Sequence, residues 1–128
     1  MIERLNHIGV AVEDIEESVK FFEEKLGAKV IMPKTDISWQ KQYSALIQIG
    51  DFQIELMQGQ TDDSVIGKFV KEKGEGLHHI SVIVDDWEKA IAEYEEKGLG
   101  IIGKAPAIKF GFIHPKSCKG VLVEVTKM

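Results

Sequence analysis

Residues 5–27, LNHIGVAVEDIEESVKFFEEKLG, decide the fold, because residues 77–99 repeat their pattern as LHHISVIVDDWEKAIAEYEEKGL. Each stretch reads as a short alternating strand, an acidic turn and an amphipathic helix with a glycine at its end. Two copies are too few for a solenoid, but they suit two equal modules related by a pseudo-twofold axis. Such an axis would place equivalent residues of the two copies around one central site.

Three further strand-like stretches follow each copy, so each module has the order β-α-β-β-β. We therefore expect an α+β fold in which two βαβββ modules, residues 3–58 and 76–127, form a curved mixed sheet around a cleft. A linker helix over residues 62–73 would join them within a single domain of residues 1–128.

Composition narrows the possible partners. The net charge of −5 and the absence of a long basic cluster argue against nucleic-acid binding. No apolar run is long enough to span a membrane, and the N-terminus shows no signal-peptide pattern. The single cysteine, Cys118, cannot form an intramolecular disulfide, which suits a reducing compartment. We expect a cytoplasmic protein that binds neither nucleic acid nor membranes.

Four residues that recur between the modules carry the chemistry. His7 and His79 occupy the same position of the repeat, and each module ends with a strand that has a glutamate, Glu55 or Glu124, at its centre. Two imidazoles and two carboxylates around one divalent ion leave one or two positions open, as in a catalytic metal site. Mixed nitrogen and oxygen ligands favour one Co²⁺, Ni²⁺, Zn²⁺, Mn²⁺ or Fe²⁺ ion over Ca²⁺ or Mg²⁺.

Each of these residues also has an ordinary structural interpretation. A strand histidine is most often a satisfied core residue, and a strand glutamate often faces solvent on an open sheet. The recurrence of both residue types in both modules favours the metal site. The small residues Gly9, Ala11 and Ser81 on the same strand faces support a cavity there.

Three longer motifs connect the chain to a known family. The stretches LNHIGVAVEDIEESVKFFEEKLG, DDSVIGKFVKEKGEGLHHISVIVDD and HPKSCKGVLVEV, together with GDFQIELM, resemble the vicinal oxygen chelate superfamily. Within it they are most similar to the methylmalonyl-CoA epimerase family. The resemblance implies metal ligands at His7, Glu55, His79 and Glu124, with Glu124 also moving a proton. It further implies inversion at a carbon alpha to a thioester carbonyl, an acyl-CoA substrate and a homodimer.

The chain departs from the family where the substrate would bind. The segment DISWQKQYS replaces the family's usual sequence before the third strand, and Ser44 stands where some members have a second catalytic glutamate. Weaker substrate-binding candidates are Gln42, Ser44, His114 and Lys116. A glyoxalase-I-like lyase is the second enzyme hypothesis, because it uses similar ligands and the same enolate chemistry. A metal-free binding protein similar to the bleomycin-resistance proteins is the third.

Overall fold

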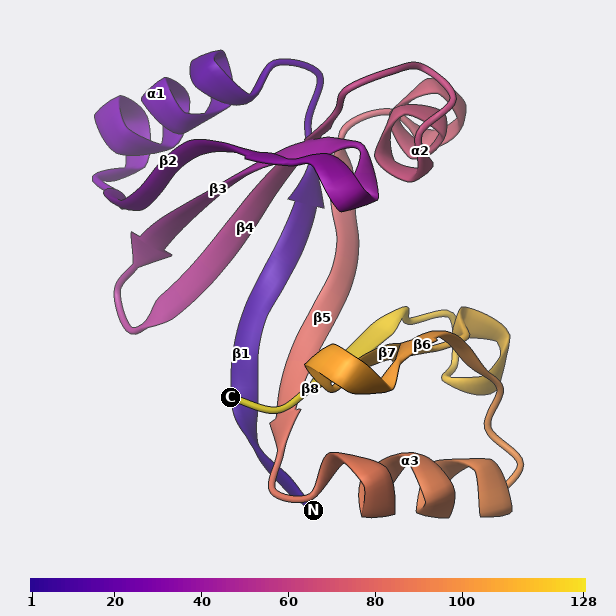
Figure 1. The fold of residues 1–128 in the computed structure, drawn as a ribbon. Helices are drawn as coiled ribbons and strands as arrows, with labels where there is room; N and C mark the ends of the chain where they lie inside the picture. Colours follow the sequence, from indigo (N-terminus) through magenta and orange to yellow (C-terminus); the bar gives the residue numbers. More distant parts are fainter. The chain divides into compact units, whose positions relative to one another are not determined.

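The computed structural model describes residues 1–128, which divide into two compact units. The first, called the 8–78 unit, comprises residues 8–78. The second, called the 79–128 unit, comprises residues 79–128 together with residues 1–7. Strand β1 (Ile2–Ala11) contributes its first residues to the 79–128 unit and its last to the 8–78 unit (Figure 1).

The 8–78 unit contains a four-stranded mixed sheet in the order β2-β3-β4-β1 (Figure 1). Strand β1 pairs parallel with β4, and the remaining pairs are antiparallel. After β1, the chain forms α1 (Ile15–Leu26), β2 (Lys29–Ile37), the 3-10 turn η1 (Ser38–Gln40), β3 (Gln42–Ile49), β4 (Phe52–Gly59), α2 (Val65–Lys73) and the start of β5 (Gly76–Val84).

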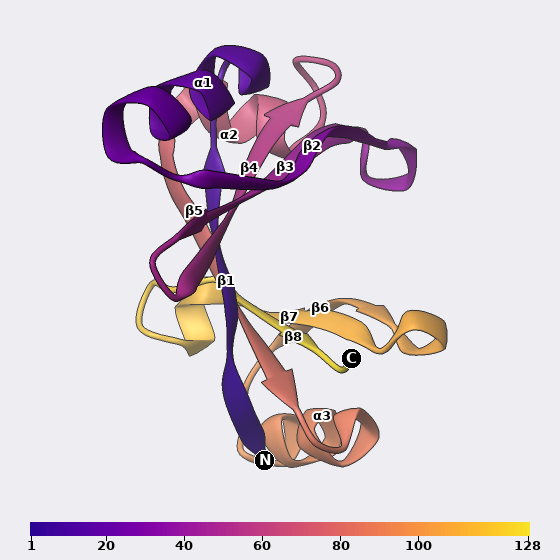
Figure 2. The ribbon, with the colours of Figure 1, turned by 90° about the vertical axis from the view of Figure 1, so that its left-hand side faces the viewer.

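The 79–128 unit repeats this plan in the strand order β1-β5-β8-β7-β6. Strand β5 pairs parallel with β8, whereas β6, β7 and β8 pair antiparallel and lie side by side (Figures 1 and 2). Its later elements are α3 (Trp87–Glu96), β6 (Ile101–Ala105), the 3-10 turn η2 (Pro106–Ile108), β7 (Phe110–Ile113), the 3-10 turn η3 (Pro115–Ser117) and β8 (Val123–Thr126).

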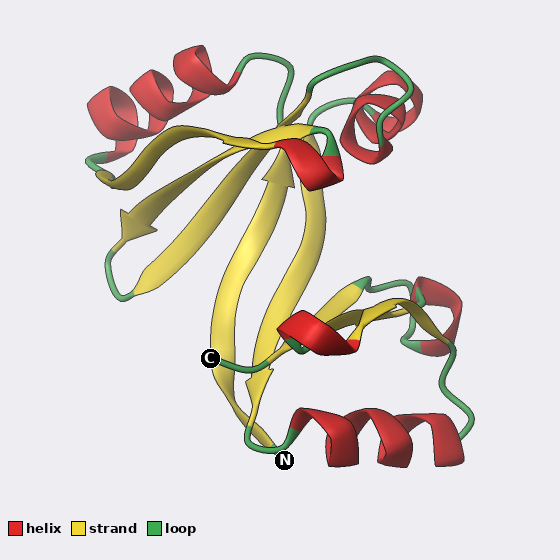
Figure 3. Ribbon diagram, viewed as in Figure 1, coloured by secondary structure: helices red, strands yellow, loops and turns green.

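Local sequence explains where the long helices begin and end. The Asp14 and Asp86 side chains accept hydrogen bonds from backbone N–H groups three residues on, which caps α1 and α3. Ser64 caps α2 in the same way. Gly27 ends α1 in the left-handed conformation, at φ 72°, which a glycine adopts without a steric penalty. The fold class α+β with a mixed sheet in each unit is confirmed (Figure 3). The division into modules of 3–58 and 76–127 stays a prediction.

Each sheet has a helix-covered face and an opposite face. In the 8–78 unit, α1 packs through Ile15 onto Ala45, Ile47 and Leu56 of the sheet. In the 79–128 unit, α3 packs onto a face formed by residues of β5 and β8: Val82, Val84, Val123 and Val125. Because neighbouring strand residues point to opposite faces, the residues between these apolar ones lie on the other side of each sheet. That side carries the proposed ligands.

Strand β2 runs to Ile37, four residues beyond the end expected from the sequence at residue 33. Its pairing with β3 is irregular between Val30 and Thr35, around Pro33. A proline has no N–H to donate to the ladder and is tolerated on an edge strand or at a bulge. β2 is an edge strand, so it passes Pro33 and resumes its pairing. None of the helices is both long enough and apolar enough to cross a membrane.

Candidate metal centre

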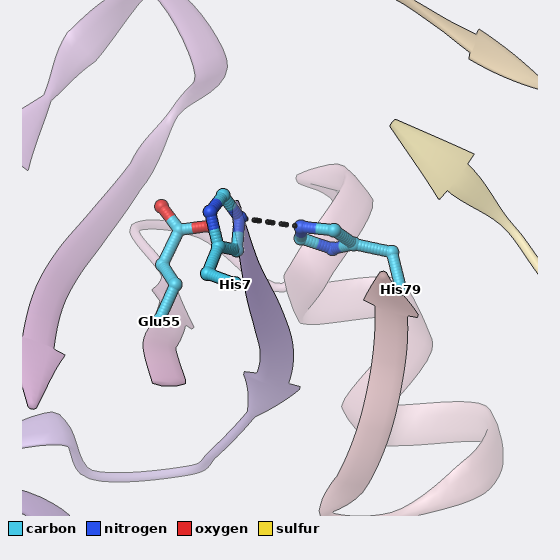
Figure 4. A group of neighbouring side chains, drawn as sticks. All are labelled: His7, Glu55 and His79. Carbon is cyan, nitrogen blue, oxygen red and sulfur yellow. Dashed lines mark hydrogen bonds between the residues drawn. The ribbon is translucent and has the colours of Figure 1, made fainter. Parts of the chain in front are cut away.

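The two repeated histidines meet in the 79–128 unit. His7, on β1, and His79, on β5, place their Nε2 atoms 3.1 Å apart (Figure 4). Their ring centroids are 5.2 Å apart and the ring planes are nearly perpendicular, at 80°. The two side chains are only 11% and 3% exposed. Two buried imidazole nitrogens at this distance face each other and require a shared proton or a cation between them.

Glu124 joins this pair from β8. It stands directly opposite Ser81 in the parallel pairing of β5 and β8. Its Oε2 lies 3.8 Å from Nε2 of His7, and its Oε1 lies 3.9 Å from Nε2 of His79. The Ser81 hydroxyl donates a 2.5 Å hydrogen bond to Oε2, and both side chains are buried. The 79–128 unit therefore holds two imidazoles and one carboxylate together.

The separations between these three groups suit a divalent ion. Metal bonds of about 2.0–2.2 Å put neighbouring ligand atoms roughly 3.0 Å apart at 90° and roughly 4.2 Å apart across the ion. The observed separations of 3.1, 3.8 and 3.9 Å lie within that range. Imidazole nitrogen with carboxylate oxygen is also the donor set of divalent transition-metal sites. His7, His79 and Glu124 therefore fit a metal ion.

The tautomer of His7 is set by a neighbour. The amide Nδ2 of Asn6 lies 3.1 Å from Nδ1 of His7 and donates to it. With Nδ1 as an acceptor, the proton of the neutral ring sits on Nε2, which then donates to Nε2 of His79. Binding a metal through Nε2 requires that proton to move to Nδ1. Asn6 would then present its carbonyl oxygen to the ring.

Glu55 occupies the equivalent place in the 8–78 unit, on β4 (Figure 4). It pairs with Gly9 of β1 in the same parallel register in which Glu124 pairs with Ser81 of β5. Within this unit its carboxylate also acts on His78. Burial lowers the pKa of His78, and the negative charge of Glu55 opposes that effect. His78 packs edge-on against Phe69 and serves the fold, as the alternation of β5 predicts.

The weaker substrate-binding candidates fall into two places. Gln42 donates from Nε2 to the Ser44 hydroxyl at 2.9 Å, and both residues are buried in β3. Cross-strand pairing of Ser44 with Met57 and of Leu46 with Glu55 places this polar pair on the Glu55 face. His114 instead caps η3, where its Nδ1 accepts from the backbone N–H of Lys116. The structure thus gives His114 a role in shaping its own turn.

Sequence reasoning missed two neighbours of the ligands. Strand alternation places Ser81 on the His79 face, which was noted only for its small size; its bond to Glu124 depends on the register of two distant segments. Phe112 is the cross-strand partner of Glu124, and its ring lies 6.1 Å from that of His79. Only the pairing register, which no local pattern specifies, reveals these contacts.

Comparison with known proteins agrees with this geometry. The family model described as "Glyoxalase/Bleomycin resistance protein/Dioxygenase superfamily" matches residues 6–113. The mitochondrial methylmalonyl-CoA epimerase of Bos taurus is 33% identical over 132 residues, covering 95% of this chain and 73% of the relative. An ethylmalonyl-CoA/methylmalonyl-CoA epimerase of Cereibacter sphaeroides is 32% identical over 136 residues, with both chains covered completely.

A solved structure shows the same likeness in three dimensions. A methylmalonyl-CoA epimerase of Streptomyces coelicolor, in complex with 2-nitronate-propionyl-CoA, has a TM-score of 0.89 at 28% identity, over 99% of this chain and 95% of the other. The chain belongs to the glyoxalase/bleomycin resistance/dioxygenase superfamily. Within that superfamily of metal-site and binding folds, it belongs to the methylmalonyl-CoA epimerase family.

Proposed function

We propose that the protein is a metal-dependent isomerase that epimerises a 2-substituted malonyl-CoA, with methylmalonyl-CoA as the substrate. The observation that carries this proposal is the buried cluster of His7, His79 and Glu124, whose nitrogen and oxygen atoms are spaced for one divalent ion. Epimerase relatives at 32–33% identity support the reaction class. An acyl-CoA analogue bound to the Streptomyces coelicolor neighbour supports the substrate class.

Glu55 completes the proposed ligand set. Its register against Gly9 matches that of Glu124 against Ser81, and His7 and His79 each lie two residues earlier on those strands. Residues two apart on a strand share a face, so each glutamate shares a face with its module's histidine. We therefore assign His7, Glu55, His79 and Glu124 to one Co²⁺, Ni²⁺, Zn²⁺, Mn²⁺ or Fe²⁺ ion.

When bound, such an ion would supply positive charge that stabilises the enolate form of the thioester. The protein's own residues do the rest. Burial withdraws water from the Glu124 carboxylate, which makes it a stronger base toward the hydrogen on the substrate's C2. A second group must return the proton on the other face. Ser44 cannot act as a carboxylate base, and Gln42, which binds it, serves only to orient a substrate oxygen.

The test follows the C2 hydrogen of methylmalonyl-CoA in deuterated water, with mass spectrometry for exchange and chiral analysis for inversion. The metal-loaded protein should do both, and Glu124→Gln should slow exchange by about 10²-fold or more, the usual scale of general-base catalysis. Glu16→Gln, an exposed change of the same kind on α1, is the control.

Other outcomes select other functions. Conversion of the methylglyoxal–glutathione hemithioacetal without any C2 exchange would replace the epimerase proposal by the glyoxalase-I-like one. Full thermal stability and ligand binding in metal-free protein would favour a binding protein of the bleomycin-resistance type instead.

We also propose a cytoplasmic homodimer, in keeping with the lone Cys118 and with the resemblance to the family. Sedimentation of the purified protein at micromolar concentration tests the assembly. A single species of about 14 kDa, the mass of one chain, would refute the dimer.

A further inference from the structure

We propose that Ser81 is a positioning residue that fixes the Glu124 carboxylate and selects the oxygen it offers to the metal. This inference rests on the proposed function, because it assigns Glu124 to a metal site. The hydroxyl of Ser81 donates to Oε2 at 2.5 Å. That oxygen is thereby a weaker donor toward a metal, so Oε1, which lies 3.9 Å from Nε2 of His79, becomes the ligand atom.

The contact is built into the fold. Ser81 and Glu124 are direct partners in the parallel pairing of β5 with β8, and their exposures are 0% and 8%. A fully buried hydroxyl needs an acceptor, and a buried carboxylate needs donors, so each satisfies the other. A hydrogen bond to a charged acceptor is roughly twice as strong as a neutral one, and it holds the carboxylate plane at one rotation.

The equivalent contact cannot form in the other half of the repeat. Gly9 takes the place of Ser81 opposite Glu55, and it has no side chain to donate a hydrogen bond. The tether is therefore a property of one glutamate and does not follow from the repeated fold. It makes Glu124 a one-oxygen ligand, whereas the β1 residue paired with Glu55 imposes no such restriction.

Three variants test this assignment in the full-length protein. Ser81→Ala removes the donor. Ser81→Cys keeps a side chain of similar size with a much weaker donor, and it covers the case in which alanine fails to fold. Ser81→Thr keeps the hydroxyl and serves as the rescue. The matched control is Ser64→Ala, which removes another buried serine hydroxyl, the cap of α2, from a place remote in sequence from every proposed ligand.

The readouts are the Kd for Co²⁺, from competition with a chromophoric chelator, and the visible absorption of bound Co²⁺, which reports coordination number. Losing a partner that orients a metal ligand typically weakens metal binding by about 10–100-fold. We expect at least a tenfold higher Kd and a changed spectrum for Ser81→Ala, a smaller effect for Ser81→Cys, and near wild-type values for Ser81→Thr. Ser64→Ala should lower thermal stability with the wild-type spectrum retained.

The outcomes separate this inference from the proposed function. If wild type binds Co²⁺ and Ser81→Ala, or Ser81→Cys where alanine does not fold, binds it equally tightly with the same spectrum, Ser81 has no positioning role and the metal site stands. If Ser64→Ala changes the spectrum as much as Ser81→Ala does, the effect is one of general stability and the inference is wrong. If wild type itself binds no divalent ion, the metal site and the inference both fail.

Discussion

Asn6 should control how tightly His7 binds a metal. Its amide lies 3.1 Å from Nδ1 of His7, and in the metal-bound form the ring must carry its proton on that nitrogen. The amide oxygen can accept this proton, and Asn6→Ala removes the acceptor. Loss of such a partner costs about 10–100-fold in metal affinity. Because Asn6 is only partly buried, water can replace it in part, and we expect about tenfold, or ~1.4 kcal/mol.

Asn6→Asp gives the opposite expectation. A carboxylate can only accept, so it favours the proton on Nδ1 and makes Nε2 a better ligand. The substitution also adds a negative charge, and Arg4→Gln is the control because it changes the net charge by the same amount on the same strand. Chelator competition with Co²⁺ or Zn²⁺ measures all three variants. Unchanged affinity in Asn6→Ala, or weaker binding in Asn6→Asp than in wild type, would refute the role of Asn6.

Three further predictions concern stability. Removing a metal present at 100 times its Kd should cost about 2.7 kcal/mol, which for a chain of this length lowers the Tm by roughly 10 °C; differential scanning calorimetry with and without chelator checks this. Trp87→Phe should lower the free energy of unfolding in urea by ~1–3 kcal/mol, because the buried indole N–H donates to the carbonyl of Val125 at 3.1 Å and phenylalanine leaves that carbonyl unpaired. Burial raises the pKa of Tyr94, so the unfolded chain ionises first and stability should fall above about pH 10; Tyr94→Phe should flatten that decline in alkaline melting curves.

Much of the fold could be predicted because its signals are local. The caps at Asp14 and Asp86 and the stop at Gly27 depend on residues within one helical turn. The alternation around His7 and His79 assigns each strand a face without any knowledge of its partner. Since a repeat must fold in the same way twice, two copies made each assignment firmer. Both histidines do meet, as the repeat predicts.

The surroundings of the site could not be predicted in this way. Ser81 and Glu124 are 43 residues apart, and the pairing register of β5 with β8 decides whether they touch. Asn6 is adjacent to His7, and alternation alone would place its side chain on the opposite face from the imidazole. Its reach back to Nδ1 is a rotamer property that only the structure shows. Hydrogen-bond partners of ligands thus lie beyond pattern reasoning even where the ligands do not.

The repeat supplies like ligands in unlike surroundings, and the chemistry requires this difference. Two imidazoles and two carboxylates related by a twofold axis would offer a substrate two equivalent orientations, yet methylmalonyl-CoA presents a thioester carbonyl and a carboxylate that differ. Opposite Glu124 stands Phe112, whereas Leu46 stands opposite Glu55. Ser81 binds one glutamate, and Gly9 leaves the other without that partner. The two halves therefore present different polarity and hydrogen bonding to the same kind of ligand, which lets a pseudo-symmetric site hold an unsymmetrical substrate in one orientation.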